Sequence, residues 1–162
     1  MTLPDIPRLY TALAEWLACT LYLVSLRPRL GRLSTVLLSA CWLVVLGGFL
    51  QITGSVPLTW WIPCMAAAVA GMFLYIFTCC DVSARDAGYC CARAFLLAEF
   101  AASLEWQLHC TLWPQFSGWQ PLPLLLLVVV YAAVFGIFYW FEFRRLKQNP
   151  TLGITGRALA SA

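Results

Sequence analysis

The stretch Ser83–Cys110, SARDAGYCCARAFLLAEFAASLEWQLHC, decides how this chain folds. Its apolar and small residues form one continuous run, which is long enough for a membrane-crossing helix. Four ionisable side chains interrupt that run: Arg93, Glu99, Glu105 and His109. In a membrane such groups are rare, and they usually have a partner or a function.

The composition of the whole chain places this helix in a lipid bilayer. Of the 162 residues, 62% are hydrophobic and 10% are charged, whereas a soluble domain carries about 25% charged residues. We therefore predict an integral membrane protein. The net charge of +3 is too small to indicate nucleic-acid binding.

Hydrophobic runs of about 20 residues each predict spanning helices. The predicted spans cover about 9–26, 33–50, 58–78, 84–110 and 122–143. The fold class is then all-α, a polytopic transmembrane helix bundle over residues 1–150. Residues 151–162 form a linker and, from Thr155, the first turns of a sixth helix that the chain cuts short.

The basic residues predict the orientation, because cytoplasmic loops are enriched in Lys and Arg. Arginines or lysines occur at 27–32, at 85 and at 144–157, but there are none at 51–57 or 111–121. We expect a multi-pass protein of the cell membrane with an outside amino terminus and a cytoplasmic tail. Arg8, on the predicted outer side, departs from the pattern.

Helix 84–110 should lie inside the bundle. Each charge at the centre of a membrane costs about 2.5–3.5 kcal/mol on the insertion scale, which its few large apolar residues do not offset. Small residues four apart allow helices to approach closely. This helix has three such pairs, Gly88/Ala92, Ala94/Ala98 and Ala98/Ala102.

The ionisable residues define a candidate polar site. Glu105 and His109 are four apart and share a helix face. With the predicted topology they lie in the outer half of the membrane, as does Glu15 of the first span. Glu15, Glu99, Glu105 and His109 would then line one cup for a small ligand or ion from the outer side, with Trp16 and Trp106 near its rim.

Two questions about this site stay open from the sequence. Arg93 lies deeper than the cup, and it either extends toward the inner surface or pairs with another helix. The carboxyl groups either bind a ligand or form inter-helix hydrogen bonds in their protonated form.

The other reactive residues do not indicate catalysis. The chain has eight cysteines, but Cys79-Cys80 and Cys90-Cys91 are adjacent pairs that make no C-x-x-C chelate. We expect them to pack as small apolar residues, with no metal and no cofactor. No nucleotide-binding, hydrolase or metalloprotease motif is present, so these residues offer no catalytic group.

The runs Asp86–Phe95 (DAGYCCARAF) and Ala98–Gln107 (AEFAASLEWQ) resemble the amino-terminal, multi-span sensor region of bacterial GHKL-type sensor histidine kinases. The resemblance implies helices that pass a signal to an ATP-dependent kinase. The 162 residues have no dimerisation helix and no nucleotide-binding motif, and His109 is too near the outer surface to accept a cytoplasmic phosphate. A response regulator would be reached only through that missing kinase part.

The sequence therefore predicts the membrane-embedded input region of a histidine kinase in the bilayer, with a second copy of the chain in a homodimer as a candidate partner. A small transporter or channel subunit that uses the intramembrane Arg and Glu residues is the alternative. A structural membrane partner without a ligand is a third.

Overall fold

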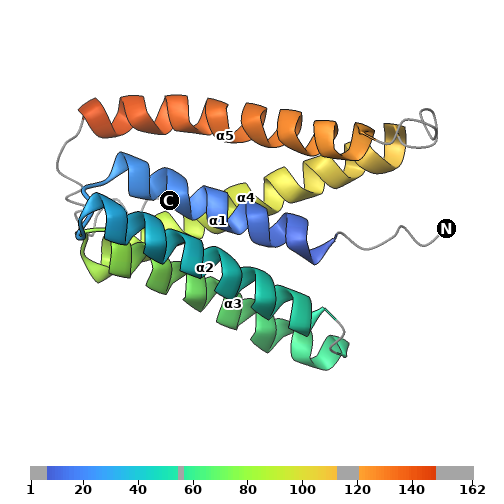
Figure 1. The fold of residues 1–162 in the computed structure, drawn as a ribbon, viewed down its shortest axis with the longest axis horizontal. Helices are drawn as coiled ribbons and strands as arrows, with labels where there is room; N and C mark the ends of the chain where they lie inside the picture. The colour runs from blue at the N-terminus through green and yellow to red at the C-terminus, as the bar shows by residue number, and fades with distance from the viewer. Residues whose placement is uncertain (1–6, 55–56, 113–120, 149–162) are drawn as a thin grey trace, which may run out of the picture.

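The computed structural model describes residues 7–54, 57–112 and 121–148. They form the five helices α1 (Arg8–Ser25), α2 (Arg32–Thr53), α3 (Leu58–Cys79), α4 (Ala84–Leu112) and α5 (Leu122–Gln148) (Figure 1). The described residues contain no β-strand, so the all-α prediction is confirmed. The predicted linker and sixth helix at 151–162 lie outside the described residues.

Ser83 caps the start of α4. The Ser83 Oγ accepts a hydrogen bond from the Asp86 backbone N–H at 3.2 Å, and the Ser83 hydroxyl donates to the Asp86 carboxylate at 2.7 Å. This arrangement satisfies one of the backbone donors that a helix leaves free in its first turn. Pro7 and Pro57 are the N-cap residues of α1 and α3. A proline is tolerated at the start of a helix because no intrahelical hydrogen bond needs its backbone N–H.

The helices run up and down, and two connections meet at one end of the bundle (Figure 1). There the Arg29 N–H donates to the Cys79 carbonyl at 2.9 Å, and the Asp81 N–H donates to the Arg27 carbonyl at 3.0 Å. Pro28 and Cys80 form an isolated antiparallel bridge between these contacts. We call this the clasped end. The C-terminal end of α5 lies at the same end.

Helix α1 is the centre of the bundle, since it contacts each of the other four helices. Most of its surface is covered, and Leu9 and Val24 are its large exposed apolar residues. Helix α4 contacts α1, α3 and α5, and within the described residues it does not reach α2. It exposes Leu96 and Phe100 on its outer face. The prediction that α4 is enclosed holds for one face only, and α1 is the more enclosed helix.

Four of the described helices are long and apolar enough to cross a membrane, namely α2, α4 and most of α3 and α5. This composition supports a membrane protein. Helix α1 is not among these candidates in the described part of the chain. Four of the five predicted spans are therefore supported. The polar residues Arg8, Glu15 and Thr20 make α1 less apolar. A helix surrounded by protein does not need a lipid-compatible surface on every side.

Buried alanines of α1 and α4 belong to one core cluster. Ala14 and Ala18 of α1 are buried, as are Ala94, Ala98 and Ala102 of α4. Both predicted pairs that contain Ala98 therefore lie on the packing face. Such small residues allow the two backbones to approach closely in a membrane.

The third predicted pair is wrong, because Ala92 is exposed. Ala92 lies two residues before Ala94, and two residues turn a helix by about 200°. The two alanines therefore point to opposite sides of α4.

Candidate functional site

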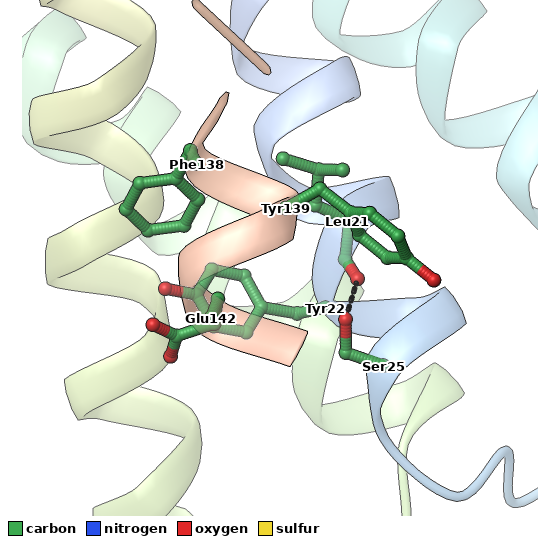
Figure 2. A pocket seen from close by; sticks show the side chains of 6 residues that line it. All are labelled: Leu21, Tyr22, Ser25, Phe138, Tyr139 and Glu142. Carbon is green, nitrogen blue, oxygen red and sulfur yellow. Dashed lines mark hydrogen bonds between the residues drawn. The ribbon is translucent and has the colours of Figure 1, made fainter. Parts of the chain in front are cut away.

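Helices α1 and α5 meet near the clasped end around Tyr22 and Glu142 (Figure 2). The two helices leave only a narrow crevice that has no room for a water molecule. Its lining residues are Leu21, Tyr22, Ser25, Phe138, Tyr139 and Glu142. The buried Tyr22 hydroxyl has no hydrogen-bond partner, while the Ser25 hydroxyl donates to the Leu21 carbonyl at 2.8 Å. The crevice is therefore a packing seam between the two helices.

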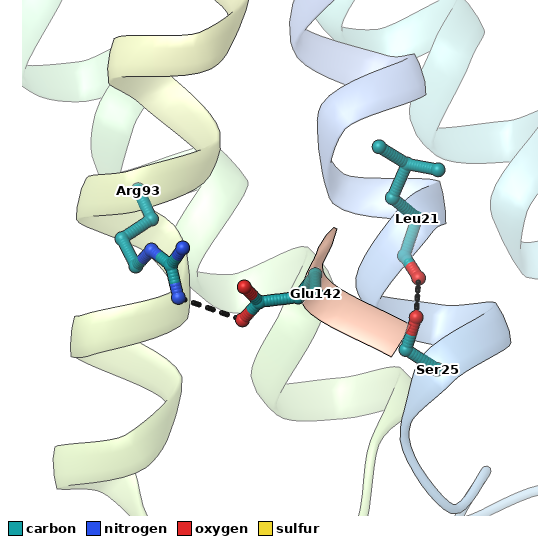
Figure 3. Close-up of polar contacts among 4 residues, drawn as sticks. All are labelled: Leu21, Ser25, Arg93 and Glu142. Atoms are coloured by element: carbon teal, nitrogen blue, oxygen red, sulfur yellow. Dashed lines mark hydrogen bonds and ion pairs between the residues drawn. The ribbon is translucent and has the colours of Figure 1, made fainter. Parts of the chain in front are cut away.

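Arg93 reaches this seam from α4 and pairs with Glu142 of α5 (Figure 3). Its Nη1 donates to Glu142 Oε1 at 2.7 Å. The guanidinium carbon also lies 5.5 Å from the Tyr89 ring centroid and 5.3 Å from that of Phe138, within the range of cation–π attraction. Of the two predicted fates of Arg93, pairing with another helix is the one observed.

Sequence reasoning missed Glu142 because it ends an aliphatic run and looks like the boundary of a span. A depth comparison could have found it. Helices α4 and α5 are antiparallel, so a residue early in α4 lies level with one late in α5. Arg93 is nine residues beyond Ala84, and Glu142 is six residues before Gln148.

Glu15 lies in the core of the bundle without a hydrogen bond. Its side chain is 0% exposed, and neither carboxyl oxygen has a partner. The carboxyl group of Glu99 on α4 is close enough to interact with it electrostatically. Glu99 is only partly buried, and Arg8 attracts it from the first turn of α1. We call Arg8, Glu15 and Glu99 the Glu15 group.

Glu105 lies in a second group, farther along α4. It is also 0% exposed, and its two oxygens have no hydrogen bond. His109 Nδ1 is 4.0 Å from Glu105 Oε1, and the His109 ring stacks on Trp106 with centroids 5.1 Å apart. The Tyr131 phenol of α5 is near Glu105. We call Glu105, His109 and Tyr131 the Glu105 group.

The predicted cup is therefore divided. The structure brings Glu15 together with Glu99, and it brings Glu105 together with His109. Arg93 belongs to neither group, because it is paired near the clasped end. A buried carboxylate without a partner is strongly unfavourable when it is ionised, so both buried glutamates are stable only when their charge is neutralised.

Trp16 lies away from the rim on which the sequence placed it. Its Nε1 donates to the Ser39 carbonyl at 2.9 Å and to the Ser39 hydroxyl at 3.1 Å. The Tyr75 hydroxyl shares hydrogen bonds with Ser39 at 2.6 Å and with Thr20 at 3.1 Å. This network joins α1 to α2 and α3 through Trp16 and Thr20. The sequence alone did not reveal it, because each of these residues is common in membrane helices.

Five free cysteines lie in the core where α1, α3 and α4 meet. They are Cys19, Cys79, Cys80, Cys90 and Cys91. No three His, Cys, Asp or Glu residues of the described chain converge as a metal site. At the connection after α3, burial raises the pKa of the Cys80 thiol to about 12. Such a thiol stays neutral and unreactive.

The chain matches no protein-family model, no curated protein and no solved structure. The functional argument therefore depends on the two carboxyl groups, the ion pair and the central helix.

Proposed function

We propose that this bundle is the membrane-embedded input region of a bacterial signal-transducing histidine kinase. The observation that carries the proposal is the position of Glu15, an unpartnered carboxyl group on the one helix that contacts all the others. A change of charge there would alter the packing of every helix pair that includes α1. The kinase assignment itself is supported by the resemblance of the runs Asp86–Phe95 and Ala98–Gln107.

In this proposal all five helices cross the membrane, and the clasped end is cytoplasmic. The arginines of the two clasped connections support that orientation. The amino terminus is then outside, and the ligand reaches the polar groups from the outer side. The bundle works as a homodimer in the bilayer.

The signal leaves through α5. This helix is tied to α4 by the ion pair between Arg93 and Glu142, and it continues as a helix to Gln148. A ligand that binds two arrangements of α1 and α4 with different affinities shifts the population between them. The ion pair would transmit that shift to α5 and to the cytoplasmic tail.

The test fuses the chain, through its tail, to a GHKL-type kinase module and measures autophosphorylation in membrane vesicles. We expect Glu15→Gln to fix the kinase output at one level, because a neutral side chain removes the charge change. We expect Glu142→Gln to disconnect the output from the outer half of the bundle. If both variants fold and give the wild-type output under all conditions, the proposal is wrong.

A small transporter or channel subunit is the second candidate. It is favoured by two interior carboxyl groups that make no hydrogen bond, Glu15 and Glu105. Vesicles that contain the chain and an internal pH dye distinguish the two functions. Proton flux that is lost in both Glu15→Gln and Glu105→Gln would support transport, whereas a sensor gives no flux.

A further inference from the structure

Glu15 is a fully enclosed carboxyl group on the central helix. Its side chain is 0% exposed, and both carboxyl oxygens lack a hydrogen bond. Its position on α1 differs from that of a surface acid, because α2, α3, α4 and α5 all pack against this helix.

The ionisable groups that interact directly with Glu15 supply no positive charge, because Arg8 of the Glu15 group attracts Glu99. Helix α4 supplies the Glu99 carboxyl group and the Cys91 thiol. Helix α1 itself supplies the Cys19 thiol, one turn away. Among the described residues these neighbours are an acid and neutral thiols. An ionised Glu15 would therefore be repelled by the Glu99 carboxylate, and it would also lack solvation by water.

The remaining helices contact α1 through neutral hydroxyl groups. Ser39 of α2 and Tyr75 of α3 are hydrogen-bonded to each other and to Trp16 and Thr20, which follow Glu15 on α1. Tyr131 of α5 donates to the Tyr10 carbonyl at 2.8 Å. None of these groups carries a positive charge.

We propose that Glu15 is a reversible proton-binding site, and that the proton is the ligand that this input region reads. This inference rests on the proposed function. A proton fits better than a metal ion, because no three metal-ligating side chains of the described residues converge. When the proton binds, the carboxylate forms an O–H bond and becomes neutral, and no other co-reactant is needed.

Glu99 provides the route to the surface. It is partly exposed, it lies beside Glu15 on the facing helix, and Arg8 attracts its carboxylate. A proton can pass between water and Glu15 through this carboxyl group. When Glu15 loses its proton, two neighbouring carboxylates repel each other across the α1–α4 contact, and the helices move apart or admit water.

The test is infrared difference spectroscopy of the whole chain in lipid vesicles, because a protonated carboxyl group absorbs apart from a carboxylate. The acid-minus-alkaline spectrum of the wild type should contain a protonated-carboxyl band that Glu15→Gln removes. Glu142→Gln is the matched control, since the Glu142 carboxylate is paired with Arg93. The Glu15 band should remain in that variant. Glu99→Gln should change the pH at which the band appears.

Two further arms complete the experiment. If Glu15→Gln does not fold, Glu15→Asp keeps a carboxyl group and should move the band rather than remove it. The proposal is overturned if the wild-type and Glu15→Gln spectra are the same. It is also overturned if the band follows sodium concentration at fixed pH and not pH itself.

The outcomes separate this inference from the function on which it rests. A Glu15 band that titrates, together with a fused kinase that ignores Glu15→Gln, would confirm proton binding and contradict the sensor. A kinase that responds to Glu15→Gln without any Glu15 band would contradict proton binding alone.

Discussion

Arg93 and Glu15 are accommodated in the bundle in two different ways. Arg93 has a carboxylate at 2.7 Å and two aromatic rings beside it, so its charge is compensated within the protein. Glu15 has neither a hydrogen bond nor a cation. At the scale of single residues, the first arrangement stabilises one packing of α4 and α5. The second makes the packing of α1 depend on a proton.

The ion pair should contribute measurably to stability. In Glu142→Gln, Arg93 keeps its charge but loses its partner, and removing one member of a buried pair costs about 3–5 kcal/mol. We expect the free energy of unfolding to fall by about 3 kcal/mol, the low end of this range, because water reaches the Arg93 side chain, which is 25% exposed. Denaturant unfolding of the chain in mixed micelles measures the change.

The double variant provides the control for this prediction. Arg93→Gln together with Glu142→Gln leaves no buried charge, so its loss should be smaller than the sum of the two single losses. Additive losses would show that the two side chains do not interact.

At the scale of helices, alanines of α1 and α4 share one buried seam. Ala14 and Ala18 of α1 and Ala94, Ala98 and Ala102 of α4 are buried in the same core cluster, and the two helices are in contact. Without a hydrophobic driving force between helices in lipid, close packing of small residues is a main source of attraction. The seam also sets the distance between Glu15 and Glu99.

A larger side chain in this seam should separate the helices. We expect Ala98→Leu to reduce stability by about 1–3 kcal/mol, as overpacking of a close-packed interior does. Ala92→Leu is the matched control on the same helix, because Ala92 is exposed and the change adds the same atoms there. Unfolding of both variants in the same micelles tests the prediction. Equal losses of stability would show that Ala98 does not lie in a close-packed seam.

Much of the structure at the scale of helices could be predicted from the sequence, because it depends on local patterns. The Ser83 cap, the helical runs and the pairs that include Ala98 follow from spacing alone. The central position of α1 could not be predicted in this way, since burial against four neighbours is a property of the assembled bundle. The hydropathy of a segment indicates how well it tolerates contact with lipid. It does not indicate how many helices will cover a segment such as α1.

The site could be predicted only in part for a similar reason. The pairing of Glu105 with His109 follows from a spacing of four residues on one helix. The pairing of Arg93 with Glu142 and of Glu15 with Glu99 depends on which helices are neighbours and at what depth. Charge spacing along one segment contains no such information.

At the scale of the whole molecule, the clasped end joins the two helical hairpins α1–α2 and α3–α4. Two backbone hydrogen bonds, which flank the Pro28–Cys80 bridge, connect residues 27–29 to residues 79–81. The alternation of basic residues predicted that these two connections lie on one side of the membrane, and their direct contact confirms that they share an end. Which side of the membrane that end faces stays a prediction.

Labelling from one side of sealed vesicles tests the orientation. In a background with Cys41, Cys64 and Cys110 replaced by serine, the five buried cysteines should not react with an impermeant maleimide. Exposed positions then receive single cysteines: Leu30 and Ala84 at the clasped end, and Gln51 and Thr111 at the other.

We expect Leu30→Cys and Ala84→Cys to be labelled only from the cytoplasmic side, and Gln51→Cys and Thr111→Cys only from outside. Cell lysis should make all four accessible. Labelling of Leu30→Cys and Ala84→Cys from opposite sides would contradict the arrangement of the bundle.

The enclosure of α1 also affects the order of biogenesis. Helix α1 is synthesised before its four partners, and the end of α4 follows it by roughly 90 residues. At about 5–20 residues per second, a nascent α1 waits on the order of ten seconds for the surface that covers Glu15. During that interval α1, which is only weakly apolar, must be held by the translocon or at the lipid interface. Variants that slow elongation between α2 and α4 should therefore be degraded more, although the finished bundle is unchanged.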